Sequence, residues 1–340
     1  MTSTIAASLC ELPGCCRRDL VIKCTHNKNS ISGGGFSVQI ASVSKPVAAK
    51  NMEAGTLASK PATSFTDRLL TDTGDAASVA LSDSAKRRLV IGKSQLPIAP
   101  PPDSGLETVL FADERTRIVS TDQQPWKLVC ALEIEAPWGR FVGTGWFAGP
   151  RTVITAGHCV FDKKQMGGWA DKITLTPGRD RERKPFNCFT SERFSSINAW
   201  IERQDPDYDI AAIHLDQDVF PASEVFRVGA LPDAELQDYL INVSGYPASP
   251  GGGTELYWAK NRIRAVEPRR IYYDVDTSGG QSGGPAYIYP DENSRPIVVG
   301  IHAYGVGGTP ASMNLRVNSA PRIIPEVVTQ IQAWLAGPAD

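Results

Sequence analysis

From residue 127 onward the chain is a succession of short apolar or alternating runs, and this rhythm restricts the possible folds more than any other feature. Glycine, proline, asparagine and aspartate separate the runs. The runs are residues 127–134, 152–156, 172–176, 209–215, 239–244, 256–260, 270–275, 285–289, 296–302 and 313–317. Many short strands separated by turn residues predict an all-β sandwich or barrel.

A different periodicity begins near the C-terminus. Apolar residues recur there at helical spacing, at positions Ile324, Val327, Val328, Ile331, Trp334 and Leu335. This pattern predicts an amphipathic helix over residues 325–335, which ends before Gly337 and Pro338. Its apolar side is expected to pack on the protein core.

The first 107 residues differ in composition from the rest of the chain. Their aromatic residues are Phe36 and Phe65, and Ala, Ser, Thr and Gly are abundant. Such a segment buries too little apolar surface to offset the entropy lost on ordering. We therefore predict that residues 1–107 are a largely disordered leader or prosegment, which a proline-rich spacer at residues 96–102 closes. The alternative is a flexible tail that is never removed.

The composition excludes several classes of protein. The chain has 340 residues, 41% of them hydrophobic, and a formal net charge of −2, which suits a globular protein without a basic nucleic-acid footprint. It has no long apolar run, so no membrane span is expected. Residues 1–9 lack the charged and apolar regions of a signal peptide. Zinc-type spacing of Cys and His is missing from residues 108–340, so we expect no metal and no cofactor.

Three separate motifs contain residues with chemical potential. His158 lies in the run Thr-Ala-Gly-His-Cys, Asp209 begins an apolar run, and Ser282 lies in the glycine-rich segment 279–285. A serine hydroxyl becomes nucleophilic when a histidine accepts its proton, and a buried carboxylate orients that histidine. Alone, the three residues would be interpreted as a core histidine, a strand-edge cap and a tight turn. In this chain order, together, they indicate nucleophilic hydrolysis.

On these motifs the chain resembles the chymotrypsin-like (trypsin-fold) serine endopeptidases, and within them the glutamyl endopeptidase (V8-like) group. The resemblance covers residues 108–337. It rests on residues 113–117, 143–146, 149–158, 245–247, 279–285, 300–302 and 318–322. It implies two six-stranded antiparallel β-barrels, barrel 1 at about 108–220 and barrel 2 at about 235–320, with the site in the cleft between them.

The resemblance also implies roles for particular residues. His158 would be the general base, Asp209 its orienting carboxylate and Ser282 the nucleophile. The N–H groups of Gly280 and Ser282 would form the oxyanion hole. Two other carboxylates compete with Asp209, and we prefer Asp209 because it starts an apolar run; the competitors are Asp205 and Asp207.

Substrate preference follows from the same resemblance. Thr277 and His302 occupy the positions that hydrogen-bond a substrate glutamate at P1, the residue before the cleaved bond. The resemblance therefore implies a preference for glutamate, or aspartate, at P1. Gln281, before the nucleophile, carries no charge, so activation by an ion pair with a freed α-amine is not available. The alternatives are a protease with another P1 preference, a catalytically silent binding homologue, and a dedicated intracellular protease.

Residues 108–117 resemble the start of mature relatives, and Glu107 precedes them. We therefore expect a zymogen that is cleaved after Glu107. The resemblance implies a secreted enzyme that acts on protein or peptide substrates, and we expect a monomer.

The chain has seven cysteines, so at least one thiol is unpaired within it. The resemblance places Gly143 where relatives have the cysteine that pairs with Cys159. This leaves a bridge from Cys159 to Cys188 or to Cys130 open.

Overall fold

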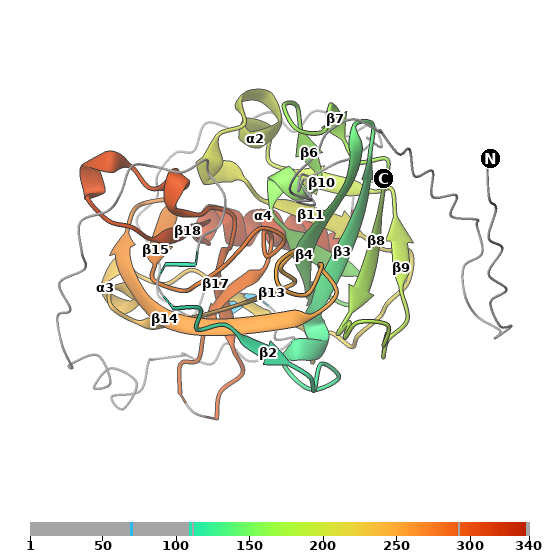
Figure 1. The fold of residues 1–340 in the computed structure, drawn as a ribbon, viewed down its shortest axis with the longest axis horizontal. Coiled ribbons are helices and arrows are strands. Elements are labelled where there is room, and N and C mark those ends of the chain that lie inside the picture. Colours follow the sequence, from blue (N-terminus) through green and yellow to red (C-terminus); the bar gives the residue numbers. More distant parts are fainter. Residues whose placement is uncertain (1–68, 71–108, 111, 292, 338–340) are drawn as a thin grey trace, which may run out of the picture. The chain divides into compact units, whose positions relative to one another are not determined.

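The structure is a computed structural model that describes residues 69–70, 109–110, 112–291 and 293–337. Except for Leu69–Leu70, the predicted leader lies outside the described residues, as does the Glu107–Thr108 junction. Figure 1 shows two curved sheets, one drawn in green and yellow and the other mainly in orange and red. The C-terminal helix α4 runs from Pro325 to Ala336. The predicted all-β architecture with a terminal helix is therefore confirmed.

The first sheet contains seven strands in the order β10-β11-β5-β4-β3-β8-β9, all paired antiparallel. Their bounds are β3 (Val129–Ala136), β4 (Gly139–Gly149), β5 (Thr152–Thr155), β8 (Lys172–Pro177), β9 (Phe189–Ser191), β10 (Phe194–Ser196) and β11 (Ala211–His214). Between them lie the ribbon β6 (Phe161–Asp162) and β7 (Gly168–Trp169), and the short helices η3 (Gly157–Cys159), α2 (Asn198–Arg203) and η4 (Pro206–Tyr208).

The second sheet contains nine strands. Six follow one another along the chain: β13 (Leu240–Gly245), β14 (Leu256–Val266), β15 (Arg270–Tyr273), β16 (Pro285–Ile288), β17 (Ile297–Ile301) and β18 (Asn318–Pro321). Three short strands join them: β1 (Leu69–Leu70), β2 (Thr116–Ile118) and β12 (Arg227–Gly229), of which β12 pairs in parallel with β17. The remaining short helices are η2 (Trp126–Leu128), α3 (Asp233–Leu236), η5 (Val306–Gly308) and η6 (Ala311–Met313).

One predicted strand is wrong. Residues 313–317 do not form a strand: η6 ends at Met313, and Asn314 then adopts a left-handed backbone conformation, with φ 50°. That conformation breaks an extended run. The strand, β18, starts only at Asn318.

The two ends of the described chain cross between the sheets. Residues 116–118 lie within the range of about 108–220 predicted for barrel 1, but they form β2, which pairs antiparallel with β14 of the second sheet, with Leu256 opposite Ile118. Helix α4 follows the second sheet, yet Leu335 packs against Gly149 of β4, where an added Cβ would lie 2.5 Å from Leu335 Cδ2. Trp334 joins the same buried cluster as Phe147 of β4.

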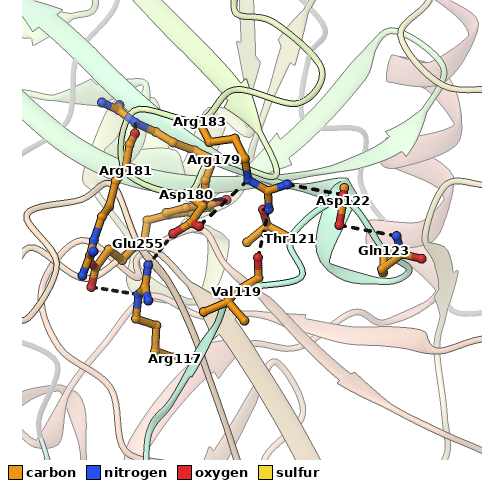
Figure 2. Close-up of polar contacts among 11 residues, drawn as sticks. Arg117, Val119, Thr121, Asp122, Gln123, Arg179, Asp180, Arg181, Arg183 and Glu255 are labelled. Atoms are coloured by element: carbon orange, nitrogen blue, oxygen red, sulfur yellow. Dashed lines mark hydrogen bonds and ion pairs between the residues drawn. The ribbon is translucent and has the colours of Figure 1, made fainter.

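A network of charged side chains surrounds β2 where it lies beside β14 (Figure 2). Arg117 of β2 contacts Asp180, with 2.5 Å between Nη2 and Oδ1, and Glu255, with 3.2 Å between Nε and Oε2. Arg181 also pairs with Glu255. The network therefore joins β2 to the loop after β8 and to the residue before β14. Such partly exposed pairs each contribute little on their own, on the order of 0–1 kcal/mol.

Three described cysteines, Cys130, Cys159 and Cys188, are free thiols, so neither bridge left open from the sequence is formed. Among the described residues, no helix has both the length and the apolar character needed to cross a membrane.

Candidate active site

His158 lies in the short helix η3 directly after β5, and it contacts Asp209 twice. Its backbone N–H donates to Asp209 Oδ1 at 2.7 Å, and its Nδ1 lies 2.7 Å from Asp209 Oδ2. Asp209 is fully buried, between η4 and β11. The close approach requires a glycine before the histidine, because a Cβ on Gly157 would lie 2.9 Å from Asp209 Oδ1. The imidazole is thereby fixed with its Nδ1 toward the carboxylate.

The two competing carboxylates have other partners. Asp207 pairs with Arg270, with 3.0 Å between Oδ1 and Nε, and its side chain is 45% exposed. Asp205 caps η4 by accepting a hydrogen bond from the backbone N–H of Asp207 at 3.1 Å. The geometry thus favours Asp209 among the three as the partner of His158.

Two opposing effects act on the pKa of His158. Burial lowers this pKa, whereas the adjacent Asp209 carboxylate raises it, and the result lies well above the usual value. An opposite charge at hydrogen-bond distance stabilises the imidazolium. The site is therefore arranged to accept a proton at His158.

Ser282 lies in the loop between β15 and β16, and its backbone is held beside η3. Its carbonyl oxygen accepts a hydrogen bond from the N–H of Thr144 at 2.8 Å and one from Cys159 Sγ at 3.5 Å. Cys159 directly follows His158. The structure therefore brings the serine loop of the second sheet next to the histidine of the first, although 124 positions separate the two residues in the chain.

The peptide groups around Ser282 have a fixed orientation. The carbonyl of Gly279 accepts a hydrogen bond from Ala248 N–H at 2.7 Å, and the carbonyl of Gln281 accepts one from Gly284 N–H at 2.9 Å. In a trans peptide the N–H points opposite to the C=O. The N–H groups of Gly280 and Ser282 therefore point away from these two donors.

Gly280 has φ +100°, a conformation that side chains rarely adopt, and an added Cβ would lie 2.7 Å from Tyr246 O. The turn before the serine consequently requires glycine at this position.

Thr277 and His302 are both fully buried. Among the described residues, Thr277 Oγ1 has no hydrogen-bond partner. His302 Nδ1 lies 2.6 Å from Tyr273 Oη. Burial, with a smaller contribution from the charge of His158, lowers the pKa of His302 to about 3, so this histidine is neutral at physiological pH.

Asp276 directly precedes Thr277 in the chain, and sequence reasoning missed its role. Its Oδ1 accepts a hydrogen bond from Leu110 N–H at 2.7 Å, and its Oδ2 accepts one from Glu114 N–H at 3.0 Å. Arg115, next in the chain, donates to Gln281 Oε1 at 3.2 Å. The segment before β2 is thus attached directly to the loop that precedes Ser282. A buried carboxylate six residues after the start of β15 offers no periodic signal that could have revealed this contact.

Two β-sheets with a histidine and a buried carboxylate from the first, and a glycine-flanked serine from the second, define the class of chymotrypsin-fold peptidases. The sequence pattern of the family described as "Trypsin-like peptidase domain" matches residues 143–301. Among solved structures, a Glu endopeptidase in complex with MPD superposes with a TM-score of 0.56 at 22% identity, covering 67% of this chain and 100% of that one. This likeness shows the fold.

Relatives in sequence narrow the class. The glutamyl endopeptidase of Bacillus licheniformis is 30% identical over 235 residues, which cover 67% of this chain and 69% of that protein. A Bacillus subtilis protein named "Extracellular metalloprotease" is 32% identical over 233 residues, covering 67% and 69%. A glutamyl endopeptidase of Staphylococcus aureus is 26% identical over 212 residues, covering 61% and 54%. The chain belongs to the V8-like group of the chymotrypsin-fold serine peptidases.

The name of the Bacillus subtilis relative raises the question of a metal site. Within the part of the chain that the structure describes, no group of three or more His, Cys, Asp or Glu side chains could hold a metal ion. The comparison shows the family to which this chain belongs, whereas the name "Extracellular metalloprotease" describes that relative alone.

Proposed function

We propose that this chain is a serine endopeptidase that cleaves after glutamate, with Ser282 as nucleophile, His158 as general base and Asp209 as the carboxylate that orients the base. The observation that carries the proposal is the double contact of His158 with the buried Asp209 at 2.7 Å, beside a loop whose serine carbonyl is bound by the Cys159 thiol.

The proposed mechanism follows from these positions. Ser282 Oγ attacks the substrate carbonyl while His158 Nε2 accepts the hydroxyl proton, and Asp209 stabilises the imidazolium that results. The N–H groups of Gly280 and Ser282 donate to the oxyanion. His158 then gives the proton to the leaving amine, and an acyl-enzyme remains. Water hydrolyses the ester by the reverse proton path, which restores the serine hydroxyl and releases the acid.

The preference for glutamate is supported by two buried hydrogen-bonding groups. Thr277 Oγ1 lacks a partner among the described residues, and a buried hydroxyl without one is costly unless a ligand supplies it. His302 receives a hydrogen bond at Nδ1 when Tyr273 Oη is the donor, which leaves the His302 proton on Nε2. A substrate carboxylate can accept hydrogen bonds from both groups.

Asp276 would favour a basic P1 residue if its carboxylate faced the substrate. Both of its oxygens instead accept hydrogen bonds from the backbone N–H groups of Leu110 and Glu114. A carboxylate occupied in this way has less capacity to pair with an arginine or lysine side chain. Asp276 therefore gives no support to a preference for a basic P1 residue.

We further propose that the protein is made as a zymogen cleaved after Glu107. The segment a few residues after Glu107 is anchored, by Leu110 to Asp276 and by β2 to β14. Cleavage just before an anchored segment would place a new α-amine beside the loop of Thr277. N-terminal sequencing of the purified active form should give Thr108 as the first residue, and a start beyond Leu110 would contradict the processing site.

The test of the activity uses protein that is expressed as the full chain and then processed to its active form. A fluorophosphonate should label Ser282, and peptides that differ only at P1 should be cut best at glutamate. Absence of labelling in a folded, processed protein would contradict the serine mechanism. Efficient labelling with poor cleavage after glutamate would leave the serine peptidase standing and remove the preference.

A further inference from the structure

The carboxylate of Asp209 has a donor that sequence reasoning did not identify. Tyr304, three residues after β17, donates a hydrogen bond from Oη to Asp209 Oδ2 at 2.6 Å. The same oxygen lies 2.7 Å from His158 Nδ1. Because Asp209 is fully buried, hydrogen bonds from the protein replace the water that would otherwise stabilise its charge. The tyrosine and the histidine thus share one carboxylate oxygen.

Tyr304 is held in place from two sides. Its backbone is paired with Ser319 of β18, with N–H to O distances of 3.1 Å and 2.8 Å in the two directions. The guanidinium of Arg270 lies over its ring, 4.7 Å from the centroid. Arg270 is in turn paired with Asp207 at 3.0 Å. A phenol located this firmly loses little further entropy when it donates to Asp209.

The contact joins the two sheets at the proposed catalytic centre. His158 and Asp209 belong to segments of the first sheet, whereas Tyr304 and Arg270 belong to the second. The ring of Tyr304 also lies 6.2 Å from that of His158, centroid to centroid. The position of the second sheet therefore bears directly on the histidine and carboxylate of the first.

Tyr304 remains a donor over the working pH range. Burial, and then the adjacent Asp209 charge, raise its pKa well above the usual value, so its hydroxyl stays protonated. A neutral O–H that donates to a carboxylate stabilises the anion. It also competes with the imidazolium for the same oxygen, which weakens the stabilisation of protonated His158.

We propose that Tyr304 is a positioning residue that acts through Asp209 to lower the proton affinity of His158. This inference rests on the proposed function, because it assigns Tyr304 to the base of that reaction. It would keep more of the histidine in its neutral, proton-accepting form at a given pH. Tyr304 itself touches no reacting atom.

Other charged and titratable groups act on this trio, and none of them is altered by the test below. They are Asp162 of β6, Cys159 of η3, Asp207 of η4, Arg270 of β15 and His302, the residue after β17.

The test compares Tyr304→Phe with the matched variant Tyr239→Phe. Tyr239 Oη donates to the carbonyl of Tyr289 at 2.7 Å in the second sheet, so this control also loses one hydroxyl and one hydrogen bond. The pH profile of kcat/KM is measured for both variants and the wild type. The acid limb of Tyr304→Phe should move up by about half to one pH unit, whereas that of Tyr239→Phe should stay in place.

A second measurement does not depend on activity. In a Ser282→Ala background, the titration midpoint of His158 is followed by NMR of protein labelled with ¹⁵N-histidine, with and without Tyr304→Phe. An unchanged midpoint, or a downward shift, would overturn the inference. That outcome leaves the proposed function intact as long as Ser282 in the wild type is labelled by a fluorophosphonate, so the two failures are distinguishable.

Discussion

The thiol of Cys159 donates a hydrogen bond to the backbone carbonyl of Ser282 at 3.5 Å. This contact fastens the residue after the proposed base to the proposed nucleophile. Gly143 lies beside the same thiol, where an added Cβ would be 2.9 Å from Cys159 Sγ and 3.7 Å from the carbonyl oxygen of Ser282. The glycine and the cysteine are therefore placed as two residues that a disulfide could join.

We predict that Gly143→Cys forms a disulfide with Cys159. Closing a loop of this size should raise the free energy of unfolding by about 3 kcal/mol under oxidising conditions. Part of the gain is offset by contact with Ile134 Cδ1, 3.3 Å from the added Cβ. Thiol counting by mass spectrometry and denaturant unfolding, with and without reductant, check the prediction. The double variant Gly143→Cys with Cys159→Ala is the control, and equal stability in both would contradict it.

The neighbouring carboxylates Asp207 and Asp209 should differ in their effect on activity. Asp209→Asn should lower kcat/KM by about 10⁴-fold, because the amide cannot hold the His158 tautomer or balance its charge. Asp207→Asn should lower it by less than about tenfold, since Asp207 contacts Arg270 and not the histidine. Steady-state kinetics on one peptide substrate measure both variants. A larger loss for Asp207→Asn than for Asp209→Asn would reverse the assignment.

The glutamate preference should not depend on a charged His302. Its pKa of about 3 makes it neutral in the free enzyme above pH 5. The ratio of kcat/KM for P1 Glu to P1 Gln should therefore be flat from pH 5.5 to 9. It should fall only as the substrate carboxyl protonates, near about pH 4.3. A ratio that drops as the pH rises through 6.5 would mean that the histidine must carry a proton.

His214 should destabilise the protein in acid. Burial and, to a smaller extent, Arg193 lower its pKa to about 4, from a model-peptide value of 6.5. Between pH 6.5 and pH 4 the unfolded chain therefore binds a proton at His214 that the folded chain does not bind. The free energy of unfolding consequently falls as the pH drops from 6.5 toward 4. The contribution is at most about 3 kcal/mol. In His214→Gln the loss of stability between pH 7 and pH 4 should be smaller by up to that amount, as measured by urea unfolding.

His158 acts in the opposite direction on stability, because its folded pKa is raised. Its contribution is fully present below the unfolded pKa and is lost as the pH rises through the folded pKa. Urea unfolding of His158→Gln and of the wild type at pH 5 and at pH 9 measures this contribution. The variant should be destabilised relative to wild type mainly at pH 5.

Local patterns were sufficient for the parts of the fold that repeat regularly. The terminal helix was predicted from its periodicity at residues 325–335 and is observed at Pro325–Ala336. The long strand β4 was not predicted, because glycines interrupt its apolar pattern. Gly145 is required there by packing, since an added Cβ would lie 2.6 Å from Val153 Cγ1. The close packing around β4 therefore requires glycine at positions where an apolar side chain would have indicated a strand in the sequence.

The site was predictable only where a motif names a residue. His158, Asp209 and Ser282 stand in recognisable runs, and their roles stay predictions. Asp276 and Tyr304 do not, because their partners lie far away in the chain: Leu110 for Asp276 and Asp209 for Tyr304. Contacts of that kind depend on how two sheets meet, which no local spacing encodes.

The crossing of the two chain ends has a consequence for how the molecule can be divided. β2 completes the sheet that lies after it in the chain, and α4 covers the sheet that lies before it. Each half therefore contributes an element that packs against or pairs with the other half. A nick in the connection at residues 216–224 would leave two fragments that stay together, and fragments made separately should regain the native structure only when mixed.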